Sequence, residues 1–152
     1  MKVAIGADHA GYELKEKLKP WLLQQGVELT DKGTVSDESV DYPDFARDVA
    51  LEVTNGRAEY GILVCGSGIG MSIAANKVPG VRAANVCSDE EARLSREHNN
   101  ANILAIGGRT LNEDAARKIV DIFLHTTFAG GRHQRRIDKI AELDAARQVP
   151  QR

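Results

Sequence analysis

Hydrophobic residues fall into short runs that alternate with helical patterns along the chain. Between the runs, apolar residues recur at three- and four-residue spacing, which is typical of amphipathic helices. Repeated alternation of strand and helix predicts an α/β protein with a parallel sheet of five strands and helices on both sides. The predicted strands are 3–6, 27–30, 61–65, 81–86 and 103–106, and the predicted helices are 12–25, 42–53, 69–77, 89–98, 111–123 and about 132–147.

Glycine and proline mark the ends of several predicted elements. Gly26 and the pair Asn55-Gly56 follow helical patterns and are expected to end them. Pro20 lies inside the first helical pattern, so we expect it to kink or shorten that helix. No linker or internal repeat divides the chain. We therefore expect one domain over residues 1–145 and a flexible tail over 146–152.

Composition narrows the functional classes. The chain has 152 residues, 42% hydrophobic and 28% charged, and a formal charge of −2. This balance argues against a nucleic-acid-binding or membrane-surface protein, because both usually carry a basic excess. Two cysteines without a CxxC motif predict neither a disulfide scaffold nor a metal cluster. The chain shows no secretion signal and no long apolar stretch, so we expect a cytoplasmic protein.

In parallel sheets, ligands bind at the carboxyl ends of strands. Here these ends are 6–11, 65–70, 87–89 and 107–109. The segment 65–70 reads Cys-Gly-Ser-Gly-Ile-Gly and opens a predicted helix. Its backbone N–H groups could hold a phosphate or an enediolate oxygen, and the alternative is a tight turn without a ligand. The loop lacks the Walker lysine and departs from the GxGxxG spacing, although Asp89 lies where a ribose-binding acid would sit.

Cys65 ends the predicted buried strand and faces the start of a helix, where a thiolate is favoured. Its alternative role is an inert core thiol. Cys87 also ends a strand, but no glycine loop follows it. Asp8 and His9 form a second polar group that suits hydroxyl and phosphate binding, while Asp8 could also cap the first helix.

Two further polar groups lie nearer the carboxyl terminus. His98 stands before three amides in the next four residues, an arrangement that suits proton transfer, although a helix cap and polar turn would also explain it. Arg132 and Arg136 are four residues apart near the start of the last helix and could clamp an anion. Their alternative is a solvated basic face. Arg109, in Gly107-Gly108-Arg109, is a third candidate for anion binding.

Together these groups suit proton transfer on a phosphorylated sugar without a metal or cofactor. The chain resembles the type B ribose-5-phosphate isomerases, whose superfamily includes galactose-6-phosphate isomerase subunits and allose-6-phosphate isomerases. The resemblance covers residues 2–144. It rests on Asp8-His9-Ala10-Gly11, Asp41-Tyr42-Pro43, Cys65-Gly66-Ser67-Gly68-Ile69-Gly70, Ala74-Ala75-Asn76-Lys77, Ser95-Arg96-Glu97-His98-Asn99 and Gly130-Gly131-Arg132-His133-Gln134.

The resemblance implies a Rossmann-like three-layer sandwich and interconversion of ribose 5-phosphate with ribulose 5-phosphate. It also implies a homodimer with shared active sites, with a tetramer left open. The roles that it implies are Cys65 as the base between C1 and C2, Ser67 as a proton carrier between O1 and O2, Gly66, Gly68, Ile69 and Gly70 as the oxyanion cradle, Asp8 and His98 in ring opening, His9, Arg109, Arg132 and Arg136 on the phosphate, and Tyr42 and Asn99 on the sugar.

Some relatives replace the cysteine by a glutamate at the position of Met71, so the chain resembles the cysteine branch. Ser67 replaces a threonine found in many relatives and keeps the hydroxyl. In the family, His98, Asn99 and the two later arginines tend to come from the partner subunit. The alternatives are another substrate (allose 6-phosphate, galactose 6-phosphate or a tetrose phosphate), a nucleotide-binding module, and a silent subunit of a hetero-oligomer.

Overall fold

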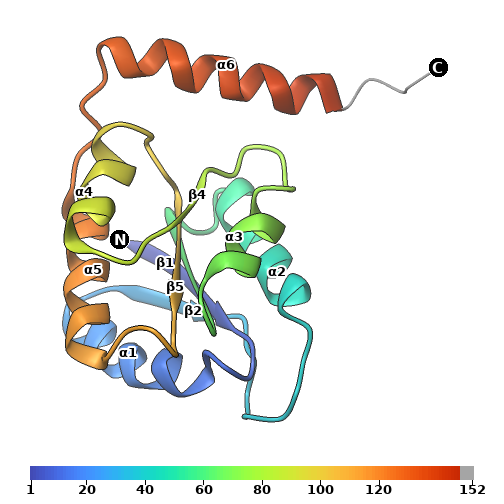
Figure 1. Ribbon diagram of the computed structural model, residues 1–152, viewed down its shortest axis with the longest axis vertical. Helices are drawn as coiled ribbons and strands as arrows, with labels where there is room; N and C mark the ends of the chain where they lie inside the picture. The colour runs from blue at the N-terminus through green and yellow to red at the C-terminus, as the bar shows by residue number, and fades with distance from the viewer. Residues whose placement is uncertain (148–152) are drawn as a thin grey trace.

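The computed structural model describes residues 1–147, and residues 148–152 lie outside the described part. All five predicted strands are present, and each pairs with its neighbours in parallel. Their order across the sheet is β2-β1-β3-β5-β4, so the sheet grows outward in both directions from the pair β1 and β3 (Figure 1). The strands are β1 (Lys2–Ala7), β2 (Glu28–Asp31), β3 (Tyr60–Cys65), β4 (Ala83–Asn85) and β5 (Ile103–Gly107).

Helices cover both faces of the sheet and give the expected three layers (Figure 1). The six helices are α1 (Tyr12–Gln24), α2 (Tyr42–Thr54), α3 (Ile69–Ala75), α4 (Asp89–Glu97), α5 (Glu113–His125) and α6 (Arg132–Arg147). One core cluster joins α1, α4 and α5 to the sheet, and a second joins α2 and α3 to the opposite face. In the central strands, successive side chains enter opposite clusters, for example Ile62 and Leu63. Burial on both faces explains why these strands read as unbroken apolar runs.

Most elements begin and end within two residues of the expected positions, and two departures need a physical explanation. Strand β4 is three residues long rather than six, since the Val81 N–H donates to the Val78 carbonyl in a turn before the strand. Helix α1 is not shortened at Pro20 and continues to Gln24. Pro20 is exposed on this helix. Gly26 and Gly56 have positive φ just beyond α1 and α2, as expected of residues that end helices.

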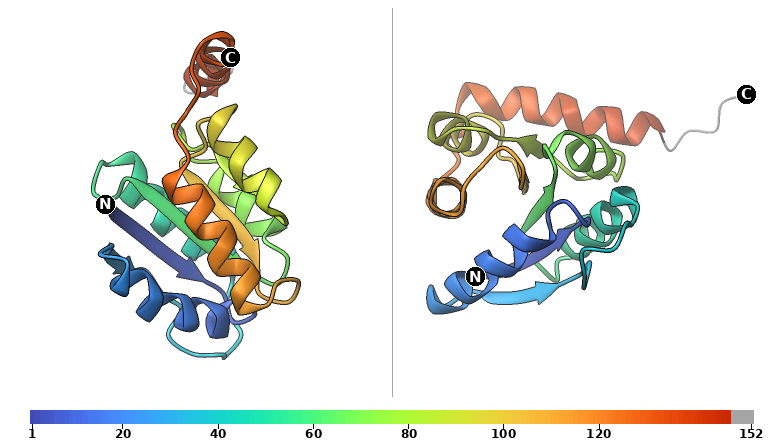
Figure 2. Two further views of the ribbon diagram at one scale, coloured as in Figure 1. Left: turned by 90° about the vertical axis from the view of Figure 1, so that its left-hand side faces the viewer. Right: turned by 60° about the horizontal axis from the view of Figure 1, so that its bottom comes forward.

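Helix α6 lies across one end of the sandwich and extends past it (Figure 2). Ile137 is its one buried residue. Two polar contacts hold its far half: the Gly80 N–H donates to Asp144 Oδ2 at 2.8 Å, and Arg147 donates to the Asn76 carbonyl at 3.2 Å. The helix includes residues 146 and 147, and the rest of the expected tail lies outside the described residues. Within 1–147, no helix is long and apolar enough to cross a membrane.

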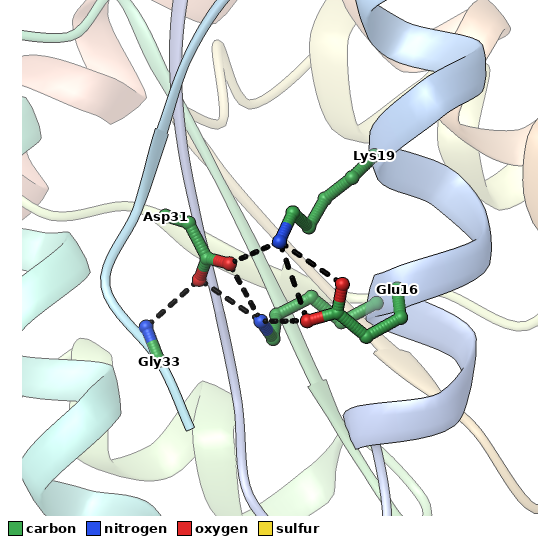
Figure 3. Close-up of polar contacts among 5 residues, drawn as sticks. Glu16, Lys19, Asp31 and Gly33 are labelled. Carbon is green, nitrogen blue, oxygen red and sulfur yellow. Dashed lines mark hydrogen bonds and ion pairs between the residues drawn. The ribbon is translucent and has the colours of Figure 1, made fainter. Parts of the chain in front are cut away.

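A buried ion-pair network ties α1 to the carboxyl end of β2 (Figure 3). The Lys15 side chain is fully buried, and its Nζ lies 2.8 Å from Asp31 Oδ2 and 3.1 Å from Glu16 Oε1. Lys19 contacts the same two carboxylates. Asp31 also accepts the Gly33 N–H at 2.8 Å. The Gly33 carbonyl in turn accepts the N–H of Ala7, the last residue of β1. The network therefore also holds the carboxyl end of β1, where the loop with Asp8 and His9 begins.

Candidate active site

A pocket of about 660 Å³ opens at the carboxyl ends of β1, β3 and β5. Its place between β1 and β3 is the point from which the sheet grows in both directions, where α/β sheets bind ligands. The volume lies within the usual range of about 300–1,000 Å³ for small-molecule sites. The lining residues are Asp8, His9, Ala10, Tyr42, Cys65, Gly66, Ser67, Ile69, Gly70, Ile73, Arg109 and Thr110.

Cys65 is the last residue of β3; the residue is 5% exposed and lines the pocket. The Gly68 N–H donates to Cys65 Sγ at 3.1 Å. An N–H group directed at the sulfur stabilises negative charge on it. Only glycine suits position 68, because φ is +84° there and a Cβ would lie 2.4 Å from Asn85 Nδ2. The glycine loop therefore directs a backbone N–H group at this sulfur.

Ser67 and Tyr42 line the pocket beside the thiol. Ser67 Oγ accepts the Ile69 N–H at 3.2 Å, which places the hydroxyl at the start of α3. The Tyr42 ring packs against Gly70, where a Cβ would lie 2.6 Å from Tyr42 Cζ. Gly70 is thus needed to admit this ring. Ile73, which the sequence did not single out, is 58% exposed and adds an apolar wall.

Asp8 and His9 are held by the backbone of two neighbouring loops. Asp8 Oδ1 accepts the N–H groups of Ala10 and Gly11, each at 3.0 Å. Asp8 therefore closes its own turn, and Gly11 is the N-cap residue of α1. His9 Nδ1 accepts the Val40 N–H at 3.2 Å. A neutral His9 thus carries its proton on Nε2, ready to donate to an anion.

Arg109 reaches the pocket from the loop after β5. Its backbone N–H donates to the Gly66 carbonyl at 3.1 Å, and its guanidinium passes close to Gly66. The residue is exposed, so the cation is free to meet a ligand at the mouth of the pocket. His9 and Arg109 supply one donor and one positive charge, which suit a phosphate group. Thr110 and Ala10 complete this side and were not singled out from the sequence.

Four predicted site residues lie away from this pocket. His98 and Asn99 follow α4 and precede β5, while Arg132 and Arg136 begin α6. They lie at the amino end of β5, and the pocket lies at its carboxyl end. Five residues at about 3.3 Å each separate the two ends by about 15 Å. A single chain does not bring these four residues to its own pocket.

The His98 and His133 rings stack on each other with their centroids 4.3 Å apart, which joins the end of α4 to the start of α6. Desolvation, together with the nearby His98, Arg132 and Arg136, lowers the pKa of His133. His98 and the arginines thus belong to one basic cluster.

Asp89, the candidate ribose-binding acid, has a structural role instead. It begins α4 and pairs with Lys118 Nζ at 2.6 Å. It is not among the residues that line the pocket. In the adjacent loop, the Gly68 N–H is directed at a thiol. These contacts remove the support for a dinucleotide site.

The chain is similar to known isomerases over nearly its whole length. Residues 3–140 match the Ribose/Galactose Isomerase family. Ribose-5-phosphate isomerase B of Escherichia coli is 48% identical over 147 residues, which are 96% of this chain and 98% of the relative. Two solved structures share the fold closely. Ribose-5-phosphate isomerase B of Clostridium thermocellum has a TM-score of 0.95 and 52% identity, with 97% of this chain and 100% of the other covered. The Mycoplasma genitalium enzyme with bound ribulose-5-phosphate has a TM-score of 0.90 and 43% identity, with 97% of each chain covered.

Proposed function

The chain belongs to the ribose/galactose isomerase family, and we propose that its pocket interconverts ribose 5-phosphate and ribulose 5-phosphate through an enediolate. The observation that carries the proposal is the Cys65 thiol, held by the Gly68 N–H at the floor of a pocket that also contains Ser67 and Arg109. A carbon acid next to a carbonyl is weak, so its base needs a stabilised enediolate more than great strength. The Cys65 thiol supplies the base, and the N–H groups of the same loop stabilise the enediolate.

In the reaction, the Cys65 thiolate removes the proton from C2 of the open-chain aldose. The electron pair of that C–H bond forms the enediolate, and the thiol returns the proton to C1. Ser67 carries the accompanying proton between O1 and O2. Backbone N–H groups of the loop 66–70 stabilise the oxyanion, and Tyr42 contacts the sugar. These roles are supported by the lining of the pocket, which includes all of these residues except Gly68, whose N–H donates to Cys65 Sγ.

Phosphate binding and ring opening need residues from both ends of the sheet. His9 and Arg109 bind the phosphate from within the pocket, and Arg132 and Arg136 join them from a second copy of the chain. Asp8 assists ring opening together with His98 of that copy, whose Asn99 contacts the sugar. The proposed homodimer is supported by the length of β5, about 15 Å, since the two groups lie at its opposite ends in one chain.

Apolar side chains are available for this assembly. Ile69 and Ile73 are exposed beside the pocket, and Ile140 and Leu143 are exposed on α6. Pairing of two copies would cover such surfaces. A tetramer would add a second interface beyond the one that completes the sites. A cytoplasmic location is part of the proposal, and it is supported by two cysteines that are both free.

The test is an isomerase assay on ribose 5-phosphate in EDTA, beside allose 6-phosphate, galactose 6-phosphate and a tetrose phosphate. We expect the five-carbon substrate to have the highest kcat/KM. Cys65→Ala should bind ribose 5-phosphate but lose at least about 100-fold in kcat, the contribution typical of a positioned base. Cys87→Ala is the matched control, since this exposed thiol lies outside the pocket lining and should leave turnover unchanged. Near-normal turnover in Cys65→Ala would refute the mechanism.

A further inference from the structure

Arg96 is a buried cation whose contacts are all uncharged. It is 5% exposed at the end of α4, and none of the ion pairs found within residues 1–147 includes it. Its guanidinium instead lies over the ring of Tyr60, 4.9 Å from the centroid, and donates to the Tyr60 hydroxyl at 3.2 Å. Burying a charge is costly unless its hydrogen-bond donors are satisfied. The groups that accept from the other N–H donors of Arg96 therefore indicate its role.

Those donors hold the two segments that carry the four distant site residues. Arg96 Nη1 donates to Asn100 Oδ1 at 2.9 Å and to the Ala101 carbonyl, both in the turn that follows His98. Arg96 Nε donates to the Thr126 carbonyl at 3.3 Å, in the segment that leads to α6. We call residues 98–102 and 126–136 together the arm. One planar guanidinium thus fixes both halves of the arm against the sandwich.

The turn itself needs such support. Asn100 has φ of +45°, a left-handed conformation that is uncommon outside glycine. Its carbonyl accepts a bond from Arg82 Nε at 2.9 Å, while its side chain accepts the one from Arg96. Burial, and after it the charge of Arg96, lowers the pKa of Arg82. Two neighbouring cations are therefore kept together at one turn, both directed at Asn100.

The halves of the arm also contact each other. The rings of His98 and His133 stack, and the Ala129 N–H donates to the carbonyl of Glu97, the last residue of α4, at 3.0 Å. A shift of the turn would therefore move the start of α6 with it. Since a misplacement of 1 Å can cost about 100-fold in rate, the geometry of the arm bears directly on turnover.

We propose that Arg96 is a positioning residue that acts across the dimer: it sets the arm of its own chain so that His98, Asn99, Arg132 and Arg136 complete the pocket of the partner subunit. The inference rests on the proposed shared site. It assigns Arg96 to the partner's reaction rather than to the pocket of its own chain. A residue with only a stabilising role would affect its own chain alone.

Three substitutions test the positioning role. Asn100→Gly keeps the positive φ but removes the acceptor for Arg96, and we expect kcat to fall about tenfold with little change in melting temperature. Asn100→Asp restores an acceptor at the same place and should recover most of that loss. Arg93→Gln is the matched control, because Arg93 is a half-exposed arginine of the same helix whose ion pairs within residues 1–147 are with Glu90 and Glu97. Wild-type kcat in Asn100→Gly would overturn the proposal.

Mixed dimers test the action across the interface. Chains carrying Cys65→Ala and Arg96→Gln are co-expressed with different tags, and the mixed dimer is isolated on both. Its one complete pocket combines the Cys65 of the second chain with the intact arm of the first, so we expect about half of wild-type activity. A mixed dimer as inactive as the two parents would overturn the proposal. The same pairing with Asn100→Gly serves if Arg96→Gln does not fold.

A parallel mixed dimer of Cys65→Ala with His98→Ala tests the shared site separately from the role of Arg96. Recovery of about half activity in this pair supports the shared site itself. If this pair recovers and the Arg96→Gln pair does not, the role of Arg96 is wrong and the proposed function stands. If neither recovers, the shared site is wrong, and the inference about Arg96 fails with it.

Discussion

Replacing Asp31 by asparagine should lower the free energy of unfolding, because it leaves the fully buried Lys15 ammonium without its shortest ion pair (Figure 3). Removing one partner of a buried pair typically costs about 3–5 kcal/mol. The Asp31 side chain is 28% exposed, and Glu16 still contacts Lys15, so we expect a loss below this range, about 2–3 kcal/mol. For a chain of this size, that corresponds to a fall of roughly 5–10 °C in melting temperature.

The assay is urea unfolding at pH 7 and one fixed protein concentration, since the proposed assembly of two copies would stabilise the folded chain. The double variant Lys15→Met/Asp31→Leu should recover most of the loss, because an apolar pair of similar volume needs no desolvated charge. Lys17→Met is the control. Its ion pair with Glu13 is exposed, and its loss should change stability by less than about 0.5 kcal/mol.

A loss below about 1 kcal/mol in Asp31→Asn would refute this reasoning, since Lys15 would then be satisfied without its main partner. A double variant as unstable as the single one would also contradict it. In that case the cost would come from packing or from the Gly33 hydrogen bond rather than from an unpaired charge. The network would then serve the loop after β2 and not the core.

A pH series tests the network further, and two other substitutions test the site. Burial raises the pKa of Asp31, but hydrogen bonds from Lys15, Lys19 and the Gly33 N–H outweigh it and hold the pKa below the ordinary value of 3.8. The stability from this carboxylate is therefore complete above about pH 3.8 and is lost as the pH falls through the lower pKa of the folded state. The difference in free energy of unfolding between wild type and Asp31→Asn, measured in urea, should shrink over that range. A constant difference from pH 7 to pH 2.5 would contradict the assignment. Gly70→Ala should displace the Tyr42 ring and raise KM about fivefold, the effect of one lost contact of about 1 kcal/mol. Tyr42→Ala should match it, and an unchanged KM in steady-state assays of both would exclude Tyr42 from substrate binding.

The architecture could be predicted from the sequence because the pattern of hydrophobic residues agrees with the packing of the strands and helices. Strands such as β3 are buried on both faces, and their apolar runs have no other explanation in a chain of this composition. The glycine loop and Asp8-His9 were also predictable, since each directly follows a strand. The edge strand β4 was overestimated because Val81, although buried, is part of a turn.

Other features could not be read from the sequence for physical reasons. Lys15 lies at helical spacing from the apolar Leu18 and Leu22, but a lysine there looks like a surface residue until Asp31 is brought beside it by the fold. The tautomer of His9 depends on the Val40 N–H, which is 31 residues away. The distance between His98 and the Cys65 thiol depends on the fold, which places them at opposite ends of β5.

The arm lies opposite the pocket, and under the proposed shared site this placement makes catalysis depend on encounters between chains. A newly made chain carries the thiol and the histidine at opposite ends of β5, and on that proposal it turns over sugar phosphate only after it meets a second chain. At high dilution, the rate would therefore rise with the square of chain concentration rather than in proportion to it. The proposed arrangement would thus delay activity until assembly, and isolated chains would leave the sugar-phosphate pool untouched.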